Sequence, residues 1–312
     1  MAETILVTGV NGFLASHLVA RICRAFPASS VIGIGRRPSY SGPPTEKNFE
    51  FVRADLLEHG SLQALPAHAD TVVHFAGDRR TFVRPEDYTA QIHSNVLATE
   101  NMADYAIRAG ATRFVFASSV YVYSGCARMP FREDFLVYPR ENLGVSKLAA
   151  EAILNARASS GYFAATSFRI FTAYGPGAGQ DQFLSAAIRK LRSKEPVACF
   201  GNPDVERDFV HVEDIARAVV ASLSTSLGAE DGGYCILNVG SGQAVRICEV
   251  VGQLVEIMKV KKPIKFDATA FPVRAGDSNH AADLTNIRAT LGWEPEISLG
   301  EGLRNLVGSF EE

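Results

Sequence analysis

The residues best placed to do chemistry near the start of the chain form a glycine-containing turn. The run Thr8-Gly9-Val10-Asn11-Gly12-Phe13-Leu14 follows a short apolar segment and precedes a helical pattern of apolar residues. Gly9 and Gly12 permit a tight turn and a close approach of the backbone. Exposed amides and the positive end of the helix dipole can then bind the pyrophosphate of a dinucleotide. The turn therefore predicts a dinucleotide-binding site.

Arginines supply a second set of candidate binding groups. Arg36 and Arg37 end the second apolar segment, and Arg207 and Arg274 lie in the second half of the chain. A guanidinium group is always charged, and its planar set of donors suits phosphate oxygens. With no acid beside them, Arg36 and Arg37 favour NADP(H), which carries a 2′-phosphate, over NAD(H), which remains possible. Arg207 and Arg274 favour a diphosphate-bearing substrate, although all four arginines could instead be ordinary surface residues.

The elements that must position these groups alternate between short apolar runs and longer helical patterns. Continuous apolar character predicts strands covered on both faces, and the alternation predicts a doubly wound parallel α/β sheet of the Rossmann type. The predicted strands are 5–7, 31–34, 49–52, 71–75, 114–116 and 167–170. The predicted helices are about 12–26, 86–109, 143–158, 181–194, 212–226, 246–258 and 299–309.

The regular alternation weakens after residue 177, which predicts a smaller C-terminal region. We expect this region to close over the carboxyl edge of the sheet, where ligands of open α/β sheets bind. The expected division is a dinucleotide-binding domain, 1–172 plus 208–239, and a substrate-binding domain, 173–207 plus 240–312.

Composition excludes several other classes of protein. The 312 residues are 47% hydrophobic and carry a formal net charge of -3, without a block of like charges or an apolar stretch long enough to span a membrane. Neither nucleic acid nor a membrane is therefore an expected partner, and we expect a cytoplasmic protein. The five cysteines are odd in number and lack a CxxC pair. They argue against a disulfide framework and a metal site, and we expect most of them in the core.

Ordered motifs from Thr8 to Trp293 resemble the extended short-chain dehydrogenase/reductase family, whose members are NAD(P)-dependent epimerases, dehydratases and reductases that mostly act on nucleotide sugars. The glycine turn is similar to the family's TGxxGxxG, with Ala15 in place of the third glycine. Asp55-Leu56 and His74-Phe75-Ala76-Gly77 resemble two further parts of the family's cofactor site, and Asn95 matches a family asparagine that supports the active-site helix. The resemblance and the arginine argument together assign cofactor contacts to Gly9, Asn11, Gly12, Phe13, Leu14, Arg36, Arg37, Asp55, Leu56, Phe75, Ala76, Gly77, Asn95 and Lys147.

The reactive group of the family is changed in this chain. The resemblance implies that Ser119, with Ser118 beside it, binds the reacting oxygen and that Lys147 holds the nicotinamide ribose. In the family, a tyrosine four residues before this lysine passes the proton. Here that position holds Leu143, which has no ionisable proton. Losing a positioned acid-base group typically lowers the rate by a factor of ~10² to 10⁴.

Three explanations of Leu143 stay open. Another group takes over proton transfer, or the protein binds its cofactor without redox chemistry, or the substitution is engineered, although phenylalanine would be the usual engineered choice. Tyr121, Tyr138, Glu141 and Tyr174 are the nearby candidates for the first explanation. We place substitution by another group slightly ahead of the silent cofactor-binding protein.

Downstream segments resemble the substrate end of the family. Residues 169–176 are similar to RxxNxYGP, with Thr172 in place of the asparagine, and residues 207–214 are close to RDFVHVDD. Residues 274–277 resemble RPGD. The resemblance implies that Thr172, Arg207 and Arg274 bind the substrate diphosphate, with Ser118 and Ser119 near the sugar.

One missing acidic residue narrows the reaction class. The family's 4,6-dehydratases have an acid just after the catalytic serine or threonine. Val120 and Tyr121 stand at that place, so epimerisation or 4-keto reduction of a UDP-, GDP- or dTDP-linked sugar is favoured. The alternatives are a catalytically silent homologue or partner subunit, and a reductase for a carbonyl compound without a nucleotide. By analogy with the family, we also expect a homodimer joined by the helices at 86–109 and 143–158.

Overall fold

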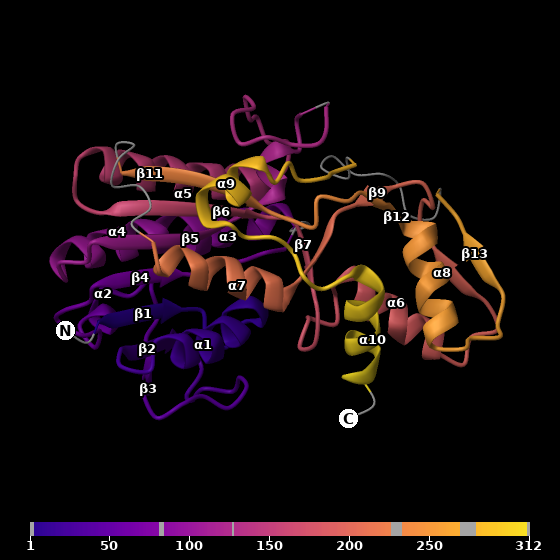
Figure 1. Ribbon diagram of the computed structural model, residues 1–312, viewed down its shortest axis with the longest axis horizontal. Helices are drawn as coiled ribbons and strands as arrows, with labels where there is room; N and C mark the ends of the chain where they lie inside the picture. Colours follow the sequence, from indigo (N-terminus) through magenta and orange to yellow (C-terminus); the bar gives the residue numbers. More distant parts are fainter. Residues whose placement is uncertain (1–2, 81–83, 127, 226–232, 269–278, 311–312) are drawn as a thin grey trace.

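A seven-stranded parallel sheet forms the centre of the computed structural model, which describes residues 3–80, 84–126, 128–225, 233–268 and 279–310 (Figure 1). The strand order is β11-β6-β5-β4-β1-β2-β3. The strands are β1 (Thr4–Thr8), β2 (Ser30–Gly35), β3 (Phe49–Arg53), β4 (Thr71–His74), β5 (Arg113–Ser119), β6 (Ala164–Ile170) and β11 (Tyr234–Val239). The predicted doubly wound α/β sheet is confirmed, and β11 is an edge strand that the sequence analysis missed.

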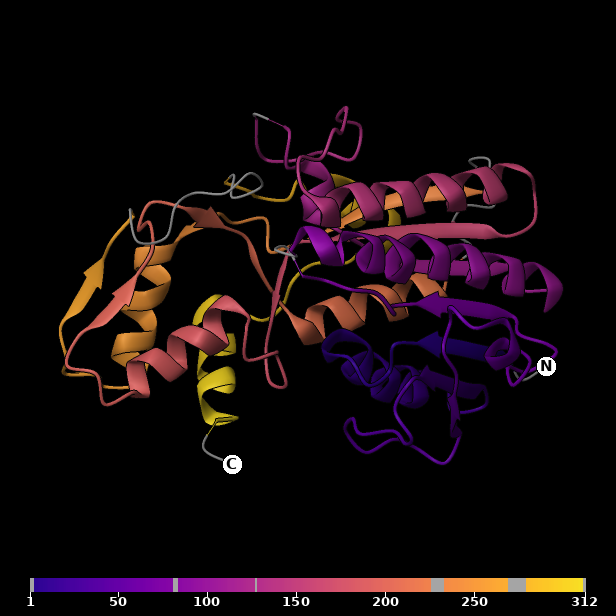
Figure 2. The same ribbon diagram turned by 180° about the vertical axis from the view of Figure 1, so that it is seen from behind.

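Both faces of the sheet are covered because successive side chains of each strand point to opposite sides. Ile5 and Val7 of β1 lie in one apolar cluster and Leu6 lies in another. The helices α1 (Phe13–Ala25) and α7 (Val212–Leu223) cover the first face (Figure 1). The helices α4 (Ala98–Arg108) and α5 (Asn142–Ser159) cover the second face. This face is turned toward the viewer in Figure 2.

The predicted helix at 86–109 is interrupted. It consists of a 3₁₀ turn, η1 (Pro85–Asp87), then α3 (Tyr88–Ile92), then a π-helical turn, η2 (His93–Leu97), and finally α4. Asn95 lies in the π turn and is buried. Such a turn inserts an extra residue and turns its side chain, so here the wider turn directs Asn95 toward the candidate site described below.

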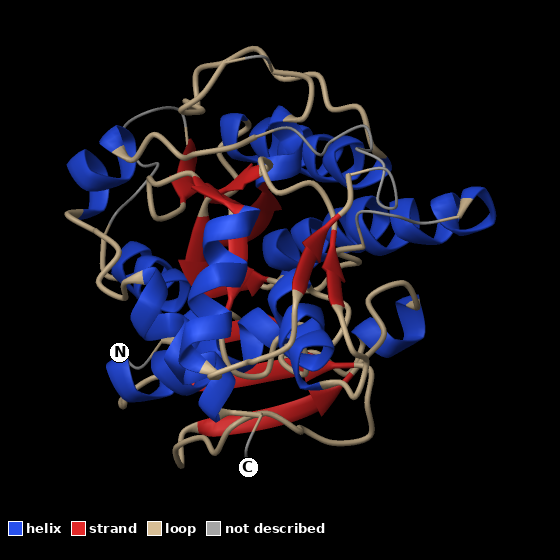
Figure 3. Cartoon of the chain, turned by 90° about the vertical axis from the view of Figure 1, so that its right-hand side faces the viewer, coloured by secondary structure: helices blue, strands red, loops and turns tan. Residues whose placement is uncertain are grey.

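A second group of helices and short strands lies beyond one end of the sheet, at the right of Figure 1, and Figure 3 views the molecule from that side. The helices are α6 (Phe183–Arg192), α8 (Ile247–Ile257) and α10 (Leu299–Gly308). The strand pairs are β7 (Thr172–Tyr174) with β10 (Phe209–His211), β8 (Ala198–Phe200) with β13 (Ile264–Phe266), and β9 (Glu206–Arg207) with β12 (Val245–Arg246). These helices share a core with Tyr174 and Phe209, separate from the clusters on the sheet.

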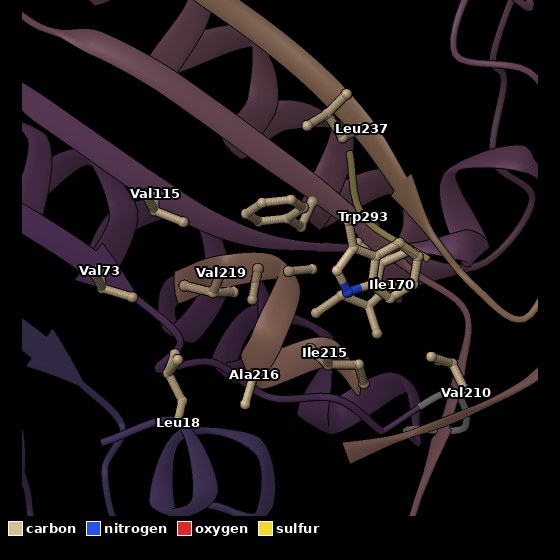
Figure 4. Close-up of a cluster of buried hydrophobic side chains, with 14 of the residues drawn as sticks. Leu18, Val73, Val115, Ile170, Val210, Ile215, Ala216, Val219, Leu237 and Trp293 are labelled. Carbon is tan, nitrogen blue, oxygen red and sulfur yellow. The ribbon is translucent and has the colours of Figure 1, made fainter. Parts of the chain in front are cut away.

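The chain then returns to the sheet. Leu284, Ile287 of α9 (Thr285–Leu291) and Trp293 join the apolar cluster to which α7 contributes. Figure 4 shows Trp293 in this cluster. The indole of Trp293 donates a hydrogen bond to the carbonyl of Asp214, at 3.1 Å. The division into two domains stays a prediction, and this stretch, which we expected in the substrate-binding domain, packs with the dinucleotide-binding sheet.

One further short helix, α2 (His59–Leu62), follows β3. Among the described helices, none combines the length and the apolar content needed to cross a bilayer. The expectation that most cysteines lie in the core is wrong, because only Cys23 is buried and the other four are partly exposed.

Candidate active site

The glycine turn lies between β1 and α1 and presses against the turn after β4. Gly9 has a φ of +75°, and a Cβ on it would lie 2.7 Å from the backbone nitrogen of Ala76. Only glycine fits this contact without a shift of the backbone. Gly12 is the N-cap residue of α1 and offers no side chain to accept hydrogen bonds from the first amides of the helix. The first amides of α1 therefore remain available to an anion, which is the arrangement that a pyrophosphate requires.

A cavity of about 260 Å³ adjoins this turn. It lies at the carboxyl ends of the first four strands of the sheet, and most of the residues predicted to contact the cofactor line it. The predicted residues along its wall are Gly9, Asn11, Gly12, Arg36, Arg37, Asp55, Leu56, Phe75, Ala76 and Gly77. Ile34, Gly35, Ala54, Leu57, Ser94 and Ala98 also line it. The sequence analysis missed these six, although most of them are chain neighbours of predicted residues at the strand ends.

Asn11 organises the loop that carries the two arginines. Its side-chain amide donates to the carbonyl of Ser39 at 3.1 Å, and its oxygen accepts from the Ser41 nitrogen at 2.9 Å. Arg37 donates to the Ser41 hydroxyl at 2.9 Å. The exposed arginine heads at 36 and 37 thus stand at the rim of the cavity on a loop tied to the glycine turn.

Asn95 connects the turn after β4 to α5. Its oxygen accepts from the Asp78 nitrogen at 2.6 Å, and its amide donates to the Asp78 carbonyl and to the Ser146 hydroxyl, both at 2.9 Å. A Cβ on Gly77 would lie 2.7 Å from the Asn95 oxygen and 3.4 Å from Lys147 Nζ. The glycine therefore lets the wall of the cavity approach the lysine.

Lys147 is 7% exposed and points from α5 toward the end of β5. Its Nζ donates to the carbonyl of Ala117 at 2.7 Å and lies 4.7 Å from the centre of the Phe116 ring. Burial lowers the pKa of Lys147 to about 8, and the negative charge of Glu151 opposes that shift. Among the described residues, no carboxylate lies within 4.0 Å of Nζ, so the charged form has little compensation.

Leu143 lies in the first turn of α5 and is 3% exposed. It precedes Lys147 by four residues, so both side chains lie on the same face of the helix. The carbonyl of Leu143 accepts from the Ser146 hydroxyl at 2.8 Å. The hydrocarbon side chain is therefore buried on the helix face that carries the lysine.

The two serines at the end of β5 face different ways. Ser119 is partly exposed, and its hydroxyl oxygen accepts from the Tyr121 nitrogen at 3.3 Å. Ser118 is buried and donates to Glu151 Oε1 at 2.5 Å. Adjacent residues of a strand point to opposite faces. We expected both serines beside the substrate, and only Ser119 has a geometry that leaves it open to one.

Behind Ser118 lies a buried ion pair that the sequence analysis missed. Arg169 donates to both oxygens of Glu151, at 3.0 and 2.7 Å, and each side chain is 3% exposed. Arg169 also donates to the Tyr123 hydroxyl at 2.9 Å. Glu151 thereby joins α5 to β5 and β6, and its place one turn after Lys147 was the only sequence signal.

The other candidates for the acid-base group lie in different places. Tyr174 is buried in the C-terminal core, with its ring 5.3 Å from the ring of His211. Tyr138 is 54% exposed. The carboxylate of Glu141 and the carbonyl of Tyr121 both lie against Gly144, in the first turn of α5. Tyr121 and Glu141 therefore contact the helix turn that carries Leu143.

Thr172, which we expected to contact the substrate, lies beside a histidine. Its hydroxyl lies 3.4 Å from Nε2 of His280, a buried residue that the sequence analysis did not single out. The Asp208 nitrogen donates to Nδ1 of the same ring at 3.4 Å, so the neutral ring carries its proton on Nε2. Arg207 is partly exposed and donates to the Glu206 carbonyl at 2.9 Å. Arg274 lies outside the described residues.

One histidine links the glycine turn to this end. His17 of α1 has its Nδ1 2.7 Å from Glu213 Oε1 and its Nε2 2.9 Å from the Pro176 carbonyl. Pro176 follows the segment that carries Thr172. The helix that starts at the glycine turn is therefore tied to the loop after β7.

Comparison with known proteins places this geometry in a family. The family model "NAD dependent epimerase/dehydratase family" matches residues 5–240. The chain is 29% identical to the GDP-6-deoxy-D-mannose reductase of Pseudomonas aeruginosa, over 100% of this chain and 98% of the relative. It is 28% identical to a UDP-glucuronate 4-epimerase of Thermodesulfobacterium geofontis, over 98% of this chain and 96% of that protein.

A solved structure agrees with the sequence relatives. MoeE5 in complex with UDP-glucuronic acid and NAD superposes with a TM-score of 0.85 at 32% identity, covering 99% of each chain. The glycine turn, the cavity at the sheet edge and the matched residues lead to one conclusion. The chain belongs to the NAD-dependent epimerase/dehydratase family and has the fold of the extended short-chain dehydrogenases/reductases.

Proposed function

We propose that this protein is an NAD(P)-dependent nucleotide-sugar 4-epimerase or 4-ketoreductase with an atypical acid-base group. The observation that carries the proposal is a continuous arrangement at the sheet edge. The cavity beside the glycine turn reaches Gly77, Gly77 borders Lys147, and Lys147 binds the strand that ends in Ser119. Cofactor groups and a partly exposed serine therefore adjoin one another.

Each residue has a separate task in this proposal. A bound nicotinamide dinucleotide supplies the hydride acceptor and donor. The amides after Gly12 hold its pyrophosphate, and Lys147 binds the ribose hydroxyls next to the nicotinamide. Ser119 donates to the sugar oxygen whose carbon gains or loses the hydride, which stabilises the charge that develops there. Thr172, Arg207 and Arg274 bind the diphosphate of the substrate.

We favour NADP(H) as the cofactor, because Arg36 and Arg37 stand at the cavity rim where a 2′-phosphate would lie. NAD(H) is the alternative, and NAD is the cofactor in the MoeE5 complex. Isothermal titration calorimetry with both coenzymes separates the two, since Arg36→Ala with Arg37→Ala should weaken NADP⁺ binding and leave NAD⁺ binding within about twofold.

Sugar conversion is the direct test of the function. Purified protein is incubated with UDP-, GDP- and dTDP-linked sugars and 4-keto sugars, with each coenzyme, and products are separated by chromatography. Conversion of at least one sugar supports the proposal. Coenzyme binding without any conversion contradicts it.

The second candidate function is a silent homologue that binds cofactor and nucleotide sugar. The buried hydrocarbon of Leu143 beside Lys147 favours this function, because it removes the proton-transfer group without disturbing the cavity. The substitution Leu143→Tyr decides between them. Activity that appears only in the substituted protein supports the silent homologue.

A homodimer also belongs to the proposal. Large apolar side chains stay exposed on the two helical segments that we expected at an interface, namely Tyr88, Leu97 and Val145. Exposed apolar groups of this kind are typical of association surfaces. Sedimentation of the purified protein tests the prediction, and Leu97→Asp should convert a dimer to a monomer.

A further inference from the structure

We infer that Lys147 is itself the acid-base group of this enzyme and exchanges the proton with Ser119 and the sugar hydroxyl through one water molecule. The inference rests on the proposed function. The family resemblance implies only that the lysine binds the ribose. The inference adds proton transfer as a second task.

The first support is the position of Nζ. In the register of the sheet, β4 ends at His74, opposite Phe116 of β5. The carbonyl of Ala117 lies beyond that end, and Lys147 Nζ donates to it at 2.7 Å. Ala117 precedes Ser119 by two residues, so Nζ is bound to the same strand end that carries this serine.

The second support is the residue type at position 143. Leu143 shares a helix face with Lys147 and lies one turn before it. A leucine side chain is shorter than a tyrosine side chain by most of the phenol ring. We place the water where the phenol of the family tyrosine would lie, with Nζ, the Ser119 hydroxyl and the substrate oxygen as its proposed partners, because buried waters usually have about three polar neighbours.

The third support is the charge environment of Nζ, which makes the neutral amine accessible. On β4, His74 is buried and stacks on Phe116, and burial lowers its pKa to about 3, so it adds no charge. On α5, Glu151 is bound to Arg169 of β6. In the turn after β4, Asp78 is bound to Arg80. Burial lowers the pKa of Lys147 to about 8, so both forms of the amine exist near neutral pH.

The proton balance is complete. In the oxidative direction, the O–H bond of the sugar hydroxyl breaks and its proton passes through the water to the neutral amine, which becomes an ammonium group. The electron pair of the C–H bond leaves as hydride to the oxidised nicotinamide. In the reductive direction, the ammonium group returns the proton to the sugar oxygen.

The test compares four variants with the natural protein. Lys147→Arg keeps a cation that cannot deprotonate. Leu143→Phe and Leu143→Tyr place the same ring at position 143 with and without the hydroxyl. Lys194→Arg, at an exposed lysine, is the matched control for a lysine-to-arginine change away from the site. The measurements are coenzyme binding by calorimetry, turnover against pH, and the NMR titration of lysine side chains labelled with ¹³C.

The expected results are specific. Oxidative turnover of the natural protein rises with pH through an apparent pKa near 8, and one lysine signal, absent in Lys147→Arg, titrates in the same range. Leu143→Phe binds coenzyme within about threefold but loses ~10² or more in turnover, and Lys147→Arg loses ~10² or more in turnover at saturating coenzyme. Leu143→Tyr keeps turnover, with a changed pH profile.

Other results overturn the inference. Turnover of Lys147→Arg within tenfold of the natural protein excludes the lysine as the proton-transfer group. Full turnover of Leu143→Phe excludes the water. If the natural protein binds coenzyme but converts no sugar while Leu143→Tyr does, the proposed function fails together with the inference, and the silent homologue is supported.

Discussion

The glycine turn with its cavity and the site that we propose for proton transfer lie at the same sheet edge, and they depend on the sequence in different ways. The first, called the cradle below, is formed largely by backbone atoms and by small residues that let segments approach. The proposed proton-transfer site depends on single side chains at positions 119, 143 and 147. A change at one of these positions should therefore remove or reroute the proposed chemistry and leave the cradle intact.

The scaffold behind the proton-transfer site offers the largest expected effect. Glu151→Ala leaves the buried Arg169 guanidinium without its carboxylate. Losing one partner of a buried ion pair typically costs about 3 to 5 kcal/mol, so we expect a loss of this order in the free energy of unfolding in urea. Glu151→Leu with Arg169→Met should cost clearly less. An equal loss in the single and double variants would show that the charge itself is unimportant.

The cradle is tested at Gly9. In Gly9→Val, the new Cβ meets the Ala76 backbone, so we expect coenzyme binding to weaken by at least ~100-fold, or about 2.7 kcal/mol. Gly252→Ala, in α8 with open space around it, is the control and should bind normally. Calorimetry measures both. Unchanged binding in Gly9→Val would separate the glycine turn from the coenzyme.

Lys147 connects the two regions, and its effect on stability depends on pH. Because its pKa is lowered to about 8 in the folded protein, the unfolded chain binds more protons between about pH 8 and the usual lysine value. The free energy of unfolding should therefore rise with pH across that window. Lys147→Met should remove this slope and stabilise the protein without coenzyme by ~1 to 3 kcal/mol at pH 7. A destabilised Lys147→Met protein would contradict this account.

The smallest expected effect lies at the rim of the cradle. Arg37→Ala leaves the loop hydrogen bonds of Asn11 in place but removes one exposed guanidinium group. We expect NADP⁺ to bind about 3- to 10-fold more weakly, which corresponds to about 1 kcal/mol for a partly solvated contact. The matched variant Arg24→Ala, on the exposed side of α1, should not change binding. A similar loss for NAD⁺ would exclude the 2′-phosphate as the bound group.

The sequence predicted the cradle better than its surroundings, for a physical reason. The apolar runs identified six of the seven sheet strands, and the glycine spacing identified the tight turn after β1, because both patterns are local. Strand β11 carries a similar apolar run at 234–239, and a fuller count of such runs could have found it. The opposite directions of Ser118 and Ser119 follow from strand alternation and could also have been predicted.

The contacts around the proton-transfer site depend on tertiary structure and had no local pattern. Glu151 meets Arg169 across 18 positions, and His280 meets Thr172 across 108. The π turn at Asn95 interrupts what reads as one continuous amphipathic helix. Residue types at these places are compatible with ordinary surface or core roles, so only the folded chain brings them together.

The position of His17 ties together two segments that lie far apart in the sequence. Its Nδ1 lies 2.7 Å from Glu213 Oε1 and its Nε2 lies 2.9 Å from the Pro176 carbonyl. One ring therefore holds the helix after the glycine turn against the loop after β7, so a shift of either segment is passed to the other. His17→Ala should uncouple them, and unchanged amide hydrogen exchange in that loop would exclude such coupling.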